Sequence, residues 1–123
     1  MIKAINKFPE RSTYGKCSKA ELPFRKRKPD GRRSNWTVPP TDDYVLANKI
    51  GYEYAAHYVQ YIKDNPDIVG MSLLGMIAKD IDFADTKTKG YWVGFFAYLE
   101  QMIHFAAKDI DIYESLGPQI GIR

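Results

Sequence analysis

Histidine and cysteine are the side chains best suited to metal binding or to catalysis near neutral pH, and this chain of 123 residues has two of the first and one of the second. Each histidine follows a glutamate by four residues, in the pairs Glu53–His57 and Glu100–His104. Residues four apart share one face of a helix, so two such pairs on facing helices could supply four metal ligands. Helical di-iron proteins instead use a three-residue spacing and additional glutamates. We therefore interpret each pair as a weak intrahelical contact at the helix surface and expect no metal site.

The remaining residues offer little else for catalysis. Cys17 lies in a basic segment without a neighbouring histidine, and the sequence has no Gly-rich phosphate loop and no Cys or His cluster with zinc spacing. We therefore expect no catalytic residue, no cofactor and no small-molecule substrate, and we predict that the protein is not an enzyme. A metal-binding helical enzyme stays open only as a distant alternative that rests on the two Glu and His pairs.

Positive charge near the start of the chain is the strongest indication of a binding function. Clustered Lys and Arg side chains neutralise phosphates and release counterions, and neighbouring aromatic rings can stack on unpaired bases. The same cluster would also suit an acidic protein surface. The candidate residues for binding nucleic acid, DNA or RNA, or an acidic partner are Arg25, Lys26, Arg27, Lys28, Arg32, Arg33, Phe24 and Trp36.

The overall net charge of +3 conceals two halves of opposite sign. Residues 1–36 hold eleven Lys and Arg against three Asp and Glu, a net charge of +8, whereas residues 37–123 hold seven against twelve, a net charge of −5. Such asymmetry is typical of a basic arm attached to an acidic body. The arm is then the part that meets a polyanion or an acidic protein.

Tyrosine is concentrated in one predicted helix, which holds five of the nine tyrosines in the chain. Tyr54, Tyr58 and Tyr61 fall on one stripe, whereas Tyr52 projects elsewhere, so a core cannot use them all. Exposed tyrosines favour protein contacts, although tyrosines at the edge of a core, with their hydroxyls in water, would give the same pattern. The candidate protein-binding residues are Tyr44, Tyr52, Tyr54, Tyr58 and Tyr61.

The elements that must position these residues begin with an arm, because prolines and glycines interrupt the first forty residues. Within the arm, Lys28-Pro29-Asp30-Gly31-Arg32 has the composition of a bulged hairpin turn. The register then places Arg27 opposite Arg33 and Phe24 opposite Trp36. We expect this arm to be loosely ordered alone, and to become ordered on an anionic partner or when Phe24 and Trp36 pack on the body.

Three helical segments follow the arm. The first is predicted from a Thr41 cap to about Lys63, and the second, capped by Asn65, is apolar all round over residues 68–78 and is predicted to be the central helix. The third, capped by Asp85 or Thr86, extends over residues 87–116, with Gly90 and Gly94 packed on the central helix. Because thirty helical residues would span about 45 Å, we expect a break at Lys108-Asp109 and a short last helix built on Ile110, Tyr113 and Leu116. The apolar run over residues 91–99 is too short to span a membrane.

The sequence thus predicts a mainly α fold, a compact bundle of three helices plus a short fourth, preceded by a basic N-terminal arm with a candidate short β-hairpin. The predicted divisions are a basic arm (1–40), a helical domain (41–117) and a C-terminal tail (118–123). One cysteine and no apolar leader favour the cytoplasm. We expect a small non-enzymatic regulatory protein whose arm contacts nucleic acid phosphates while the body docks or forms a homodimer, without membrane contact. The alternative is a protein-binding inhibitor or adaptor of a larger host machine.

Overall fold

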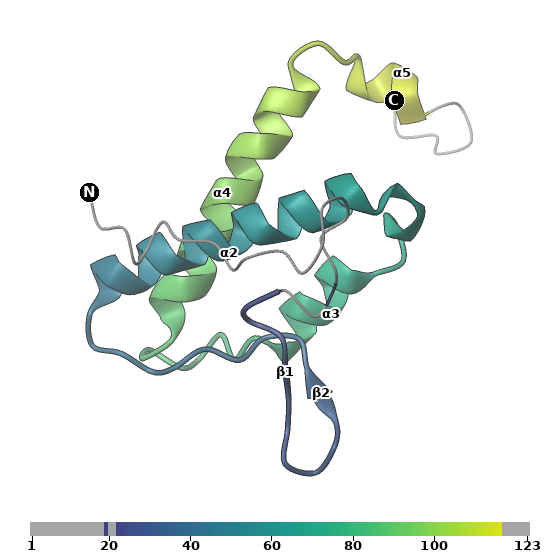
Figure 1. Ribbon diagram of the computed structural model, residues 1–123. Helices are drawn as coiled ribbons and strands as arrows, with labels where there is room; N and C mark the ends of the chain where they lie inside the picture. Colours follow the sequence, from purple (N-terminus) through teal and green to yellow (C-terminus); the bar gives the residue numbers. More distant parts are fainter. Residues whose placement is uncertain (1–18, 20–21, 117–123) are drawn as a thin grey trace.

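The computed structural model describes residue 19 and residues 22–116, and it is mainly helical with one short hairpin (Figure 1). The predicted fold class is therefore confirmed. Cys17, the first part of the arm and the predicted tail lie outside the described residues. The elements, in chain order, are strands β1 (Lys26–Arg27) and β2 (Arg33–Ser34), helix α2 (Tyr44–Asp64), the 3₁₀ helix η2 (Pro66–Ile68), and helices α3 (Leu73–Asp80), α4 (Lys89–Ala107) and α5 (Ile112–Leu116).

Helices α2 and α4 cross at very close range, and glycines make this possible. A Cβ atom on Gly51 would overlap the carbonyl oxygen of Tyr91, and a Cβ atom on Gly94 would overlap the carbonyl oxygen of Asn48. At Gly90, an added Cβ would lie 2.8 Å from the Cβ of Ala47. The packing role predicted for Gly90 and Gly94 is found, but their partner is α2 rather than the second predicted helix.

The second predicted helix is where the structure departs most from the sequence prediction. After η2, the chain passes through Gly70 and Ser72, whose φ angles of 90° and 74° are left-handed, and α3 begins only at Leu73. In α3 only Leu73 and Ile77 are buried. The prediction of a central helix over residues 68–78 is therefore wrong, because the left-handed residues divide the apolar run between two short elements. Figure 1 shows α3 at the side of the α2–α4 pair, next to the hairpin.

The helix starts also differ from the predicted caps. Asp43 caps α2, since its Oδ1 accepts a hydrogen bond from the Leu46 N–H at 3.0 Å, while the predicted cap Thr41 accepts from the Asp43 N–H. Thr88, rather than Asp85 or Thr86, precedes α4. Neighbouring Asp and Thr residues can all accept such bonds, so the local sequence leaves the choice of cap open.

The core is built around aromatic rings contributed by the hairpin as well as by the helices. Phe24 and Trp36, from either side of the hairpin, lie with ring centroids 5.6 Å and 5.1 Å from Phe95 of α4. Tyr54 of α2 contacts both hairpin rings, at 5.6 Å and 6.2 Å. Leu22, Phe24 and Trp36 belong to the same buried cluster as the helical residues. The described part of the predicted arm therefore packs on the body, as one of the two expectations for Phe24 and Trp36 stated.

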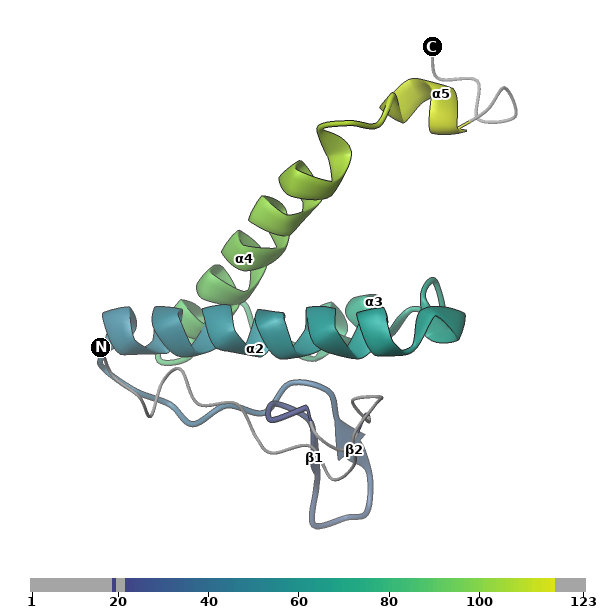
Figure 2. The same ribbon diagram turned by 45° about the horizontal axis from the view of Figure 1, so that its top comes forward.

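Beyond its crossing with α2, helix α4 continues away from the rest of the molecule (Figures 1 and 2). The predicted break near Lys108-Asp109 is found, because α4 ends at Ala107 and α5 begins at Ile112. Helix α5 has no buried residue. None of the helices in the described ranges is both long and apolar enough to cross a membrane.

Candidate nucleic-acid interface

The hairpin that carries the basic cluster has the register expected from its turn. Arg27 pairs with Arg33 and Lys26 with Ser34, and the Lys28 N–H donates to the Arg32 carbonyl at 2.6 Å. Gly31 closes the turn with a φ of 88°, a left-handed conformation that glycine adopts without strain. Figure 2 shows β1, β2 and their turn extending away from the helices. The turn residues thus close a two-stranded ribbon whose tip projects away from the helices.

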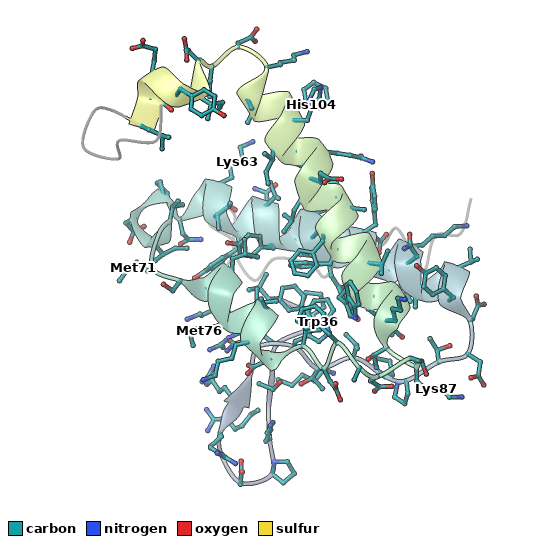
Figure 3. The ribbon with its side chains drawn as sticks, turned by 180° about the vertical axis from the view of Figure 1, so that it is seen from behind. Trp36, Lys63, Met71, Met76, Lys87 and His104 are labelled. Atoms are coloured by element: carbon teal, nitrogen blue, oxygen red, sulfur yellow. The ribbon has the colours of Figure 1, made fainter. Side chains whose placement is uncertain are left out.

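Two sets of contacts attach this ribbon to the body. The Phe24 and Trp36 rings, 5.5 Å apart, are 0% and 7% exposed, and Figure 3 shows Trp36 among the side chains between α3 and α4. Buried Asn35 donates from its backbone N–H and its Nδ2 to Asp80 Oδ2, at 2.8 Å and 3.1 Å, and its Oδ1 accepts from Arg25 Nε at 2.9 Å. The end of α3 is therefore joined through Asn35 to Arg25, the residue directly before β1.

Like charges face each other across the ribbon. Since Lys28 and Arg32 form a hydrogen-bonded pair, the next pair, Arg27 and Arg33, is a non-hydrogen-bonded one, in which side chains come closest. Strand alternation puts Arg25 on the same face as these two arginines, and burial followed by the positive charge of Arg33 lowers the pKa of Arg25. Three guanidinium groups therefore share one face, an arrangement that an anion between them would stabilise.

The predicted basic residues divide into two groups by their partners. Arg25 is half-buried and bonded to Asn35, and Arg32 donates to Asp30 from its backbone N–H and from its Nε, both at 3.0 Å. The backbone bond first and the side-chain bond second lower the pKa of Asp30. Among the described residues, no hydrogen bond or ion pair engages the side chains of the other four, all exposed: Lys26, Arg27, Lys28 and Arg33. These four are the cations that remain available to a partner.

Phe24 and Trp36 are not exposed for base stacking. The sequence interpretation offered both rings for stacking on unpaired bases, but both are enclosed in the aromatic core. Burying large rings removes more apolar surface from water than an exposed stack would. Their part in the interface is to fix the base of the ribbon.

The five candidate tyrosines do not form one exposed surface. Tyr58 and Tyr61 are buried in the core, and Tyr54 packs against it and stacks on Tyr91 with centroids 6.3 Å apart. Burial raises the pKa of Tyr54 and Tyr58, so both phenols stay neutral. Tyr52 packs edge-on against Tyr98 and donates to Gln101 Oε1 of α4. Only Tyr44 is largely exposed among the five, so the predicted protein-contact face is not assembled.

The two Glu and His pairs lie in different surroundings. His57 is buried on α2, which corrects the expectation that both pairs lie at the surface, whereas His104 is exposed on the distal part of α4 (Figure 3). Within the described part of the chain, no group of three or more His, Cys, Asp or Glu side chains could hold a metal ion. Desolvation raises the pKa of Glu53 to about 7.

The interface also uses residues that the sequence did not single out. Asn35 and Asp80 are 45 residues apart, and neither lies in a motif that signals a long-range hydrogen bond. The polar Ser34-Asn35 step directly before Trp36 was the available signal, because polar residues beside a buried ring need partners. Ser34 donates through its hydroxyl to the Trp36 carbonyl at 3.0 Å, so it is satisfied locally.

Comparison of this chain with protein-family models, curated proteins and solved structures finds no match. The features of this chain that bear on function are therefore the charges and geometry of the ribbon. Those features are an antiparallel hairpin that is attached to the core at its base and carries exposed cations without side-chain partners among the described residues.

Proposed function

We propose that the hairpin binds double-stranded DNA, with its exposed cations on the phosphates and the ribbon in the major groove. One observation carries the proposal: a basic two-stranded ribbon extends beyond the helical body, and the side chains of Lys26, Arg27, Lys28 and Arg33 make no hydrogen bond or ion pair with the described residues. The major groove of B-DNA admits a two-stranded β-ribbon. Phosphate neutralisation with counterion release supplies the affinity.

The choice of a duplex over a single strand follows from the aromatic residues. Proteins that bind single strands stack bases on exposed rings, and here Phe24 and Trp36 are buried. The major groove of an RNA duplex is too deep and narrow for side chains to read. Double-stranded DNA therefore suits the ribbon best.

The acidic body supports a defined orientation on DNA. Residues 37–123 carry a net charge of −5, so phosphates repel the helical part and attract the hairpin. Binding is thereby confined to the ribbon. This role is non-enzymatic, and we propose that it is exercised in the cytoplasm, the location that the single cysteine favours.

The rival role, a protein-binding inhibitor or adaptor that uses the tyrosine-rich helix, has less support. Tyr58 and Tyr61 are buried in the core, and Tyr52 packs against Tyr98 of α4. An acidic protein surface could still meet the same cations. A pull-down after nuclease treatment would detect such a partner.

The test is the affinity of the Arg27→Glu/Arg33→Glu variant for a short DNA duplex, measured by fluorescence anisotropy over a range of salt concentrations. The matched control is Lys49→Glu/Lys89→Glu, which changes the net charge by the same amount at exposed helical positions. We expect the arginine variant to lose at least about tenfold in affinity and to flatten the slope of log affinity against log salt by about 2. The control should bind DNA much as the unmodified chain does.

Equal losses in both variants would show that only overall charge matters, and the proposal would fail. It would also fail if a single strand of the same sequence bound as tightly as the duplex. A protein that stays bound to the unmodified chain after nuclease treatment, but not to the arginine variant, would favour the acidic-protein rival instead.

A further inference from the structure

The two faces of the hairpin carry different side chains, because neighbouring residues of a strand point to opposite sides. Lys26 and Lys28 lie on one face. The other face, here called the arginine face, holds Arg25, Arg27 and Arg33, since Arg27 pairs with Arg33 across the ribbon. The face with the lysines continues at its base into three buried residues, Phe24, Ser34 and Trp36. A ribbon in a groove can turn only one face to the floor, so the two faces have different roles.

On the arginine face, two guanidinium groups are available to a ligand. Arg27 and Arg33 are both exposed, and neither side chain makes a hydrogen bond or ion pair with the described residues. Arg25, at the base of the same face, is half-buried, and its Nε donates to Asn35 Oδ1 at 2.9 Å. On the opposite face, Arg32 is engaged by an ion pair at the turn. The arginine face is therefore the one that presents a pair of open guanidinium groups.

The register sets these two side chains at a separation that suits successive base pairs. In a non-hydrogen-bonded antiparallel pair, the Cα atoms lie about 4.5 Å apart, and successive base pairs lie about 3.4 Å apart along the axis of DNA. Like charge drives the guanidinium groups of Arg27 and Arg33 away from each other, so they reach different bases. The antiparallel pair also has a local two-fold axis between its members, which can coincide with the two-fold axis between two base pairs. Each arginine then meets one strand of the duplex.

Guanine is the base whose edge matches an arginine side chain. In the major groove it presents two acceptors, O6 and N7, and one guanidinium group can donate to both at once. Lysine has a compact, strongly hydrated charge on a flexible stem and lacks this planar fork. Contacts with phosphates position a protein on DNA, whereas contacts with base edges specify the sequence. The two faces of the hairpin carry the side chains for these two kinds of contact.

We propose that Arg27 and Arg33 recognise guanine in the major groove, one guanine on each strand of two successive G·C pairs, while Lys26 and Lys28 contact the phosphates. This inference rests on the proposed function and deepens it, because it names the class of DNA sequence that the ribbon prefers. The four exposed cations of the hairpin thereby divide into two that supply affinity and two that also supply specificity.

The test compares the affinity of the full chain for three short duplexes by fluorescence anisotropy. The duplexes share their ends and differ in a central segment, which alternates G with C, A with T, or 7-deazaguanine with C. The base 7-deazaguanine pairs with cytosine but lacks the N7 acceptor. We expect the G·C duplex to bind at least about tenfold more tightly than the A·T duplex. The 7-deazaguanine duplex should lose most of this advantage.

The variant Arg27→Lys/Arg33→Lys keeps both positive charges and removes both planar forks. It should bind the three duplexes with affinities within about threefold of one another. The slope of its log affinity against log salt should match that of the unmodified chain, because the number of cations is unchanged. The matched control is Arg32→Lys, which makes the same chemical change on the opposite face, where Asp30 holds the side chain. This control should retain the preference for guanine.

Equal affinity of the unmodified chain for the three duplexes would overturn this inference and leave the proposed function intact, because phosphate contacts alone explain binding without sequence preference. A guanine preference that persists with 7-deazaguanine, or in Arg27→Lys/Arg33→Lys, would also overturn it, since the shape of the duplex would then be the source of the preference. Failure of the chain to bind any duplex would remove the proposed function and this inference together.

Discussion

At the scale of single residues, Glu53 is the carboxylate whose surroundings oppose its charge. It lies partly buried on α2, and one of its carboxylate oxygens is buried without a hydrogen-bond partner among the described residues. Desolvation raises its pKa from an ordinary value of 4.5 to about 7. Below pH 4.5 the group is neutral in both the folded and the unfolded chain. As the pH rises from 4.5 through 7, the unfolded chain ionises first, so this group lowers the stability of the fold.

The variant Glu53→Gln should therefore unfold with a higher free energy than the unmodified chain at pH 8 and with a similar one at pH 4. We expect a gain on the order of 1 kcal/mol at pH 8, because partial exposure screens part of the effect. Urea unfolding at both pH values, compared between variant and unmodified chain, measures it. The control is Glu100→Gln, at an exposed position on α4, where no gain is expected. A gain that is equal at both pH values would mean that desolvation of the charge is not its cause.

At the scale of secondary-structure elements, the crossing of α2 and α4 depends on two glycines that allow backbone to touch backbone. Gly51 faces the carbonyl of Tyr91, and Gly94 faces the carbonyl of Asn48. This proximity brings Tyr54, Tyr58 and Phe95 together at the centre of the aromatic core. The crossing therefore also sets where the two hairpin rings can pack.

The variant Gly94→Ala should force the two helices apart, because the atom that its Cβ would meet is backbone and cannot move aside. We expect a loss of about 3 kcal/mol in the free energy of unfolding. The matched control is Gly75→Ala in α3, where an added Cβ meets nothing within 4 Å. That variant should be more stable by about 0.5 to 1 kcal/mol, because alanine favours a helix. Chemical denaturation of both variants measures the two changes in the free energy of unfolding, which should have opposite signs. Similar changes at the two sites would contradict the proposed packing.

At the scale of the whole molecule, the hairpin and the helices share one hydrophobic core, and the charge is divided between the two parts. Leu22, Phe24 and Trp36 of the predicted arm are buried in the same cluster as the helical residues. Burial of three such side chains contributes on the order of 6 kcal/mol, which is comparable with the total stability of a small domain. The basic half of the sequence is therefore both the candidate DNA-binding element and part of the core.

A fragment comprising residues 41–123 should consequently fail to fold cooperatively, although it contains every described helix from α2 onward. We expect a broad thermal transition by circular dichroism, where the full chain gives a sharp one. In the full chain, Phe24→Ala should cost about 3 to 5 kcal/mol. Thr37→Ala, at an exposed position next to Trp36, should cost little. A fragment that melts as sharply as the full chain would contradict this prediction, because it would show that the helical body folds without the arm.

The sequence by itself determined the features that depend on neighbouring residues. Pro29 and Gly31 set the hairpin turn and with it the pairing of Arg27 with Arg33. The three- and four-residue spacing of apolar side chains predicted the extent of α2 to within a few residues, and the length limit on a single helix placed the break between α4 and α5. The split of charge between residues 1–36 and 37–123 is likewise a property of composition.

Tertiary structure alone decided which apolar and polar groups meet across long separations. The run over residues 68–78 has the composition of a central helix, yet Gly70 and Ser72 adopt left-handed conformations and leave Met71 and Met76 exposed. Burial of Phe24 and Trp36, and the bond from Asn35 to Asp80, depend on where α2 and α4 cross. Periodicity gives the face of a helix that is apolar but not the partner that covers it, because hydrophobic burial is non-directional. In this protein, the close contacts at Gly51 and Gly94 determine that α2 and α4 cover each other.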